Sequence, residues 1–171
     1  LLPWLVGNGF PVHVFPVRKI GDLGNVCDYL ETMIDALRGD FESVDRLLGP
    51  AFDPDRNVWI APESLAMRDS TSGTTIAEGA VQIGPAVRIG RFCEIHPGVR
   101  ISDSNLDDDI EVQREAWIER SQIRDGAIIG PSARLSEVVV GSMSEVRSEP
   151  FNPSSLERFV ALGDEVIVYP G

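Results

Sequence analysis

Lysine is almost absent from this sequence. Lys19 is the only lysine beside fourteen arginines, and the formal net charge of the 171 residues is −12. A phosphate backbone repels a protein of this charge, so nucleic-acid binding is excluded as the main function.

Cysteine and long apolar runs are scarce as well. Cys27 and Cys93 are the only cysteines, which argues against a disulfide framework and favours a reducing compartment, the cytoplasm. No apolar run approaches the roughly 18 residues that a membrane helix requires. The apolar start, LLPWLVGNGFPVHVF, lacks the basic residues and cleavage site of a signal peptide. We expect it to be buried against protein that precedes it.

The first fifty residues have an α/β pattern. Residues 11–17 (PVHVFPV) alternate as a strand does, and Asn25 can cap a helix that Gly39 ends. The apolar face of that helix consists of Val26, Tyr29, Leu30, Met33, Ile34 and Leu37. A second short helix is expected at about 43–48, and the proline-rich segment 50–57 indicates a domain boundary.

A period of six residues dominates the remainder. The leading residues are Ile83, Ile89, Ile95 and Ile101, then Ile123, Ile129 and Leu135, and near the end Leu162 and Val168. This period is neither that of a helix nor that of a single strand. It is typical of a repeat in which one short strand and one turn form each hexad.

Three hexads would complete one triangular coil, with each leading aliphatic residue pointing inward. Stacked coils pair as parallel strands about 4.8 Å apart, and stability grows with stacking. The predicted fold class is therefore mostly β: a left-handed parallel β-helix over residues 51–171, preceded by a small α/β segment, residues 1–50.

Three segments interrupt the period. We expect loops or imperfect coils at 71–77 and 105–117, and a loop at 148–158. The acidic run 103–111 (DSNLDDDIE) is interpreted as a solvated turn, with a cation site as the alternative.

The front segment resembles a known enzyme family. The residues LLPWLVGNGFPVHVFPV, followed by GDLGNVCDYLETMIDALRG, resemble the end of the catalytic domain of sugar-1-phosphate nucleotidyltransferases, the NDP-sugar pyrophosphorylases. The matching positions are Asp22, Leu23, Gly24, Asp28, Tyr29 and Leu30. Many members also carry a C-terminal hexapeptide β-helix with endings similar to ALGDEVIVYPG. Ile20 replaces the tryptophan of the family pattern, and Asn25-Val26 replace its Thr-Pro pair.

The resemblance implies a reaction in which an NTP and a sugar 1-phosphate form an NDP-sugar and release pyrophosphate. Two oxyanions must approach each other, so Mg²⁺ is the expected cofactor. The family role of Asp22 is to bind this metal, and that of Gly24 is to let the substrate-site loop turn. An alternative for Asp22 is a structural role in the loop. Lys19 could contact a phosphate or be a solvated side chain.

The glycine-rich nucleotide loop of the family, a GxGxR pattern, does not occur in the sequence. Residues 1–50 are thus expected to be the end of an incomplete catalytic domain. We expect the chain alone to be inactive and to form a homo-oligomer through its β-helix.

Two other functions remain open from the residues. Hexapeptide acyltransferases use a histidine as general base between two subunits, and His96 would be that residue here. The β-helix could instead be a non-catalytic assembly module, with Trp59, Trp117 and Phe92 as candidate surface residues.

Overall fold

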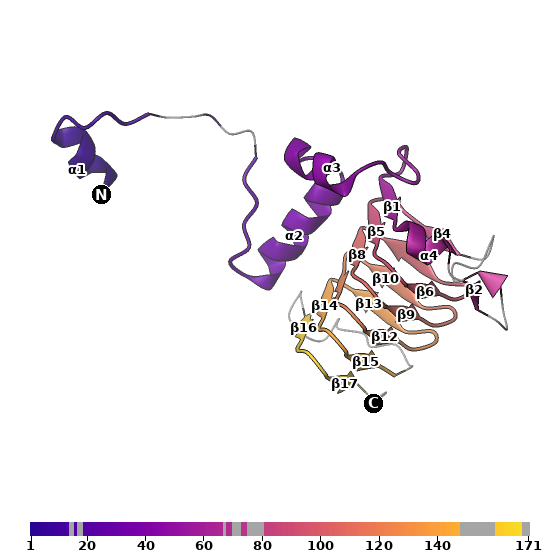
Figure 1. Cartoon of the computed structure of the whole chain (residues 1–171). Helices are drawn as coiled ribbons and strands as arrows, with labels where there is room; N and C mark the ends of the chain where they lie inside the picture. Colours follow the sequence, from indigo (N-terminus) through magenta and orange to yellow (C-terminus); the bar gives the residue numbers. More distant parts are fainter. Residues whose placement is uncertain are drawn as a thin grey trace.

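A three-sided column of parallel strands makes up most of the molecule (Figure 1). The computed structural model describes residues 1–13, 16, 19–66, 68–69, 73–74, 81–147 and 160–168. The first side of the column contains β1 (Val58–Ile60), β5 (Val87–Ile89), β8 (Ser104–Leu106), β11 (Gln122–Ile123), β14 (Val138–Val140) and β16 (Val160–Leu162). The second contains β4 (Gln82–Ile83), β7 (Arg100–Ser102), β10 (Trp117–Glu119) and β13 (Arg134–Ser136). The third contains β6 (Glu94–Ile95), β9 (Glu111–Val112), β12 (Ile128–Ile129), β15 (Glu145–Val146) and β17 (Ile167–Val168).

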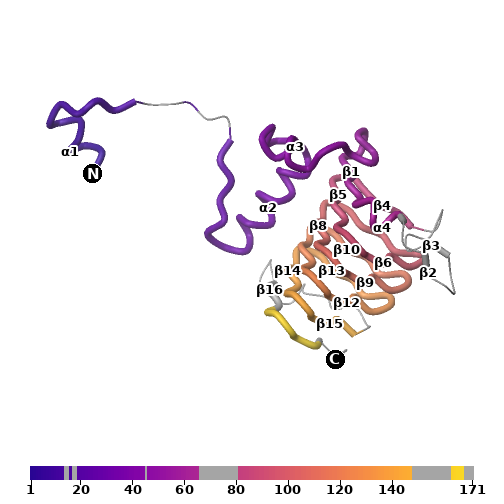
Figure 2. Tube along the Cα trace, in the orientation of Figure 1, coloured from indigo at the N-terminus to yellow at the C-terminus, as the bar shows by residue number. Residues whose placement is uncertain are grey.

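The predicted β-helix is confirmed, because all these pairs are parallel and successive turns of the chain stack into coils (Figure 2). The leading aliphatic residues line the interior. The core contains Ile89, Ile95, Ile101, Leu106, Val112, Ile118, Ile123, Ile129, Leu135, Val140 and Val146, each at most 1% exposed. Ile83 is partly buried against the same core.

The coils differ from the predicted hexads in length. Arg88 pairs with Asn105, and Asn105 pairs with Gln122, so consecutive coils are offset by 17 residues, as in the Asn105–Gln122 hydrogen bond. One side of each of these coils therefore spans five residues instead of six. The coil that begins at β4 keeps the predicted length, since Gln82 pairs with Arg100, 18 residues further on. Of the two alternatives expected at 105–117, the structure contains the imperfect coil and not the loop: β8 and β9 continue the column, and only the phase shifts.

Left-handed backbone makes the corners. Residues at all three corners have positive φ, among them Ala86, Phe92, Asp103, Asp109, Glu115, Arg120, Ser132, Glu137 and Met143, with Gly98 and Gly126 at equivalent positions. A non-glycine residue is disfavoured in this conformation. The backbone N–H groups of Asp103, Arg120 and Glu137 each donate to a carbonyl of the preceding coil, which offsets part of that cost. Glycine is required where the backbone leaves no room for a side chain. A Cβ on Gly90 would lie 2.4 Å from the carbonyl oxygen of Asp107.

Helix α2 (Val26–Leu37) confirms the predicted helix. The Asn25 side chain accepts a hydrogen bond from the backbone N–H of Asp28, so Asn25 is the N-cap. Leu30, Ile34 and Leu37 are buried, as their spacing predicts. Helix α2 lies beside the first side of the column, where Tyr29 and Arg38 make hydrogen bonds to Gln122 and Asp103.

The remaining elements are short: α1 (Leu2–Gly7), α3 (Glu42–Leu48), α4 (Pro62–Ala66), and an antiparallel pair of β2 (Arg68–Asp69) and β3 (Gly73–Thr74). Within α4, the hydroxyl of Ser64 donates to the carbonyl of Gly90 at 2.6 Å and accepts from the N–H of Cys93. Helix α4 thereby takes part in the backbone bonding of the column. No helix in the described part of the chain is long and apolar enough to cross a membrane.

Several expectations concern segments with few described residues. The strand predicted at 11–17 is described only at 11–13 and 16, which have no regular structure. The expected loops at 71–77 and 148–158 lie largely or wholly outside the described residues. Val138 pairs with Val160, an offset of 22 residues that also appears in the Ser142–Asp164 hydrogen bond, in place of 17. This coil therefore contains five additional residues. The domain boundary near 50 stays a prediction.

Candidate functional site

The three sides of the column carry different outward side chains. The first side has a polar middle: Arg88, Asn105 and Gln122 follow one another in register, between Trp59 and Val139. The third is mostly acidic, with Glu94, Glu111, Ile128, Glu145 and Ile167. The second side presents Gln82, Arg100, Trp117 and Arg134.

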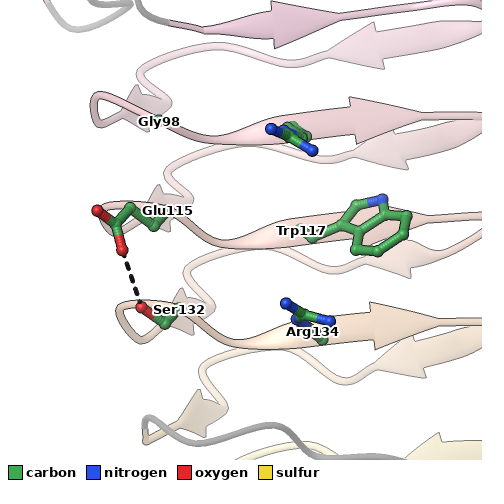
Figure 3. A pocket seen from close by; sticks show the side chains of 6 residues that line it. Gly98, Glu115, Trp117, Ser132 and Arg134 are labelled. Carbon is green, nitrogen blue, oxygen red and sulfur yellow. Dashed lines mark hydrogen bonds between the residues drawn. The ribbon is translucent and has the colours of Figure 1, made fainter.

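A pocket of about 430 Å³ lies on the second side of the column. It is lined by Gly98, Arg100, Glu115, Trp117, Ser132 and Arg134. Figure 3 shows Trp117 on a strand between its neighbours, with Glu115 and Ser132 on the adjacent turns. The pocket therefore joins a strand ladder to a corner ladder.

The chemistry of this pocket is aromatic and cationic. Trp117 is 40% exposed, and the guanidinium carbon of Arg134 lies 5.7 Å from the centre of its ring, a cation–π contact. The Ser132 hydroxyl donates to Glu115 at 3.4 Å. Such a surface can bind an anion and a planar ring together.

The acidic run 103–111 is paired with arginines. Asp107 contacts Arg124 at 3.2 Å and Arg88 at 3.7 Å. Asp108 accepts two side-chain hydrogen bonds from Arg91, which lower the pKa of its carboxyl. In the described ranges, no group of three His, Cys, Asp or Glu side chains is arranged to hold a metal ion. The predicted turn is therefore confined to the corner after β8, where arginines pair with the carboxylates of Asp107 and Asp108, while Leu106 and Ile110 are buried in the column.

Hydrogen bonds within the protein hold the loop around Asp22 in place. The Asp22 carboxylate accepts a hydrogen bond from the N–H of Gly24 at 2.8 Å, as in an Asx turn. The Thr32 hydroxyl accepts from the Asp22 N–H and donates to its carbonyl, which fastens the loop to α2. Among the described residues, the second carboxylate oxygen of Asp22 has no hydrogen-bond partner, so one oxygen remains available to a ligand.

Lys19 is paired within the protein. Its ammonium lies 2.7 Å from Asp35, also contacts Asp40, and lies 5.6 Å from the centre of the Phe41 ring. Hydrogen bonds to Asp35 and then Asp40 raise the pKa of Lys19. The lysine serves local structure at the end of α2, and its charge is already matched.

His96 and Cys93 differ in their potential for chemistry. His96 Nε2 lies 3.6 Å from Glu111 on the third side of the column, and the Gln113 amide donates to the same carboxylate. Cys93 is buried, and burial raises the pKa of its thiol to about 11. Cys93 is therefore a protonated core residue, while His96 retains an exposed ring edge. Both cysteines are free, as expected.

A buried polar ladder beneath α2 was not predicted. Gln122 is 1% exposed although it points outward. Its carboxamide oxygen accepts hydrogen bonds from Asn105 at 2.8 Å and Tyr29 at 3.3 Å. Arg88 donates to Asn105 at 3.1 Å. Burial raises the pKa of Tyr29, which keeps its phenol protonated as a donor.

The sequence analysis also missed the two arginines of the pocket. Trp117 was a candidate surface residue, but Arg100 and Arg134 were not. A signal was present: each of the three residues directly precedes a buried aliphatic residue, at Ile101, Ile118 and Leu135. Only the 17-residue offset of the coils brings them into one ladder.

Comparison with known proteins identifies the fold's relatives. Residues 69–168 match the family described as the GMPPB C-terminal domain. The bifunctional protein GlmU of Thermodesulfovibrio yellowstonii is 28% identical over 139 residues, which cover 76% of this chain and 28% of that relative. The chain thus spans about a quarter of the length of the relative it matches. Because the family match covers more than half of the sequence, the chain belongs to the GMPPB C-terminal domain family and to the sugar-1-phosphate nucleotidyltransferase group that its front segment resembles.

Proposed function

We propose that this chain acts as the C-terminal part of an enzyme that joins an NTP to a sugar 1-phosphate and releases pyrophosphate. The family match over residues 69–168 is the observation that supports this proposal most directly. The pattern from Asp22 to Leu30 supports it independently, because it lies outside the matched range.

Asp22 is the proposed contact to Mg²⁺ in the longer protein. The described residues supply this single carboxylate at the loop and form no metal-binding group, so they do not fit a complete magnesium site by themselves. Magnesium in such enzymes uses one or two carboxylates together with substrate phosphates. Gly24 holds the loop by donating its N–H to Asp22. No catalytic step is assigned to the metal here.

Release of pyrophosphate from NTPs and sugar 1-phosphates tests the proposal. The 171-residue chain is expected to be inactive, and a version extended through the upstream reading frame is expected to be active. In the extended protein, Asp22→Asn should lower kcat/KM by more than about 100-fold, because an essential charge at the metal is lost. Glu31→Gln is the control, since Glu31 is exposed on α2. A folded, extended protein without activity would refute the proposal.

The β-helix is proposed to serve self-association or regulation of the catalytic part. Large exposed apolar side chains on the column support this role, namely Phe92, Trp117, Met143 and Ile167. Side chains of this kind are enriched at protein interfaces. Sedimentation equilibrium should show the chain associating as its concentration rises. A monomer at every concentration would remove the self-association role and leave regulation.

A further inference from the structure

The second side of the column combines two arginines and a tryptophan at fixed spacing. Trp117 pairs with Arg100 on one neighbouring strand and with Arg134 on the other. Adjacent strands are about 4.8 Å apart, so the Cα atoms of the two arginines are separated by about 10 Å. The rigid ladder sets this distance without loops, which favours a preformed site.

The two arginines of the pocket lack the acidic partners that most of the described arginines have. Seven other arginines form ion pairs with carboxylates: Arg38, Arg56, Arg88, Arg91, Arg120, Arg124 and Arg147. Within the described ranges, the Arg100 side chain makes no ion pair or hydrogen bond, and the Arg134 guanidinium contacts only the ring of Trp117. Two guanidinium groups against the single carboxylate of Glu115 leave the pocket with a net positive charge. In a protein of charge −12, this makes the pocket a local site for an anion.

The geometry of a guanidinium group suits both phosphates and carboxylates, and a phosphate group offers the larger negative charge. The planar donor fork of the guanidinium matches the oxygens of a phosphate in a bidentate arrangement. Glu115 carries the opposing charge in the pocket, and Ser132 holds it at the corner. Phosphate groups are therefore expected at the arginine end of the pocket, away from Glu115.

Trp117 adds a planar surface to this anion site. At 40% exposure it retains a substantial free area on a strand whose neighbours are fixed. Stacking of a nucleobase on an aromatic side chain contributes about 1–3 kcal/mol per base. The pocket volume of about 430 Å³ falls within the range of small-molecule sites, about 300–1,000 Å³.

We propose that this pocket binds a nucleoside phosphate. The base stacks on Trp117, the phosphates pair with Arg100 and Arg134, and the ribose hydroxyls meet Glu115 and Ser132 at the corner. A polynucleotide is disfavoured because the protein as a whole is strongly acidic. The site lies on the column and is separate from the Asp22 loop, so the inference does not rest on nucleotidyl transfer by the parent enzyme.

Isothermal titration calorimetry on the full 171-residue chain tests the inference directly. The probes are ADP, GDP, UDP, inorganic pyrophosphate and adenosine. At least one nucleoside diphosphate is expected to bind with a Kd below about 1 mM, and adenosine at least about tenfold more weakly than ADP. Binding should weaken as salt is raised, because the partly exposed charges are screened.

Three variants distinguish the contribution of the phosphate groups to binding from that of the base. Arg100→Gln and Arg134→Gln should each weaken binding of the diphosphate by about tenfold or more, because a charge-assisted contact is lost. Trp117→Leu should weaken nucleotide binding by about tenfold and leave pyrophosphate binding within about twofold. Arg46→Gln is the matched control: it removes the same charge from an exposed position in α3, outside the pocket.

Each contrary outcome overturns the proposal. The first is the absence of binding by any nucleotide at millimolar concentration. The second is an equal loss in Arg46→Gln, which would indicate a nonspecific effect of charge. The third is self-association that Trp117→Leu abolishes while no nucleotide binds, which would make this face an interface between copies. Circular dichroism checks that each variant is folded. Because the replaced side chains point outward, the substitutions should leave the core unchanged.

Discussion

Ile129→Ala is expected to lower the free energy of unfolding by about 2–5 kcal/mol, the range for removing a large aliphatic side chain from a packed core. Ile129 is fully buried, and it lies in the interior ladder between Val112 and Val146. The substitution would leave a cavity between neighbouring coils. Because parallel strand pairing fixes the positions of these coils, the structure can relax little to fill the cavity. Urea unfolding followed by far-UV circular dichroism measures the change.

Ile128→Ala supplies the matched control for this experiment. Ile128 is the adjacent residue of the same strand, and its side chain points outward beside Glu111 and Glu145. It is only partly buried, so the same truncation should cost less than about 1 kcal/mol. Equal losses in the two variants would contradict an interior ladder at Ile129.

The interior of the column could be predicted from sequence because its constraint is local and repeated. The interior positions of Ile89, Ile95 and Ile101 each require a large aliphatic side chain. Their six-residue spacing is therefore visible in the sequence. The five-residue side was harder to detect. It shifts the phase after Ile101, so Leu106 and Val112 fell outside the series although both are fully buried.

The surface features could not be predicted in the same way. Arg100, Trp117 and Arg134 become neighbours only when the coil length is known to be 17 residues. A strict six-residue period predicts coils of 18 residues, a register that does not pair Trp117 with Arg100 or Arg134. The burial of Gln122 depends further on α2, which precedes it in the chain by more than eighty residues, as the Tyr29 hydrogen bond with a separation of 93 indicates. No local pattern encodes such a contact.

At the Asp22 loop, by contrast, the candidate residues came from the sequence and not from the structure. Resemblance selected Asp22 and Gly24 as site residues, and the structure places them in one turn joined by a hydrogen bond. That geometry is compatible with a metal ligand and equally with a structural turn. The role of Asp22 therefore depends on the longer protein and stays a prediction until the pyrophosphate assay is done.

Helix α2 connects the front segment to the column, and a second large effect is expected there. Leu30, Ile34 and Leu37 form its buried stripe. At 100° per residue, Tyr29 and Arg38 lie on opposite edges of this stripe, and both bond to the column. The stripe therefore faces the first side of the column. None of the three aliphatic residues belongs to the core cluster of the column itself.

Ile34→Asp should consequently detach α2 and leave the column folded. Burying an unpaired carboxylate costs several kcal/mol, more than the partly exposed Arg38–Asp103 ion pair can offset at about 1 kcal/mol. A local loss of about 3 kcal/mol corresponds to a decrease of about 100-fold in amide protection across α2. Hydrogen exchange with mass spectrometry measures this on peptides that cover 26–38, compared with peptides that cover 128–146.

The control for this variant is Glu31→Ala, which changes an exposed position of the same helix and should leave protection unchanged. Full protection of α2 in Ile34→Asp would mean that the apolar stripe does not hold the helix. Loss of protection in β12 and β15 as well would mean that α2 and the column unfold as one unit. The expected result separates them: Asn105 and Gln122 remain hydrogen-bonded to each other, so the face of the column that α2 uncovers can be hydrated at low cost.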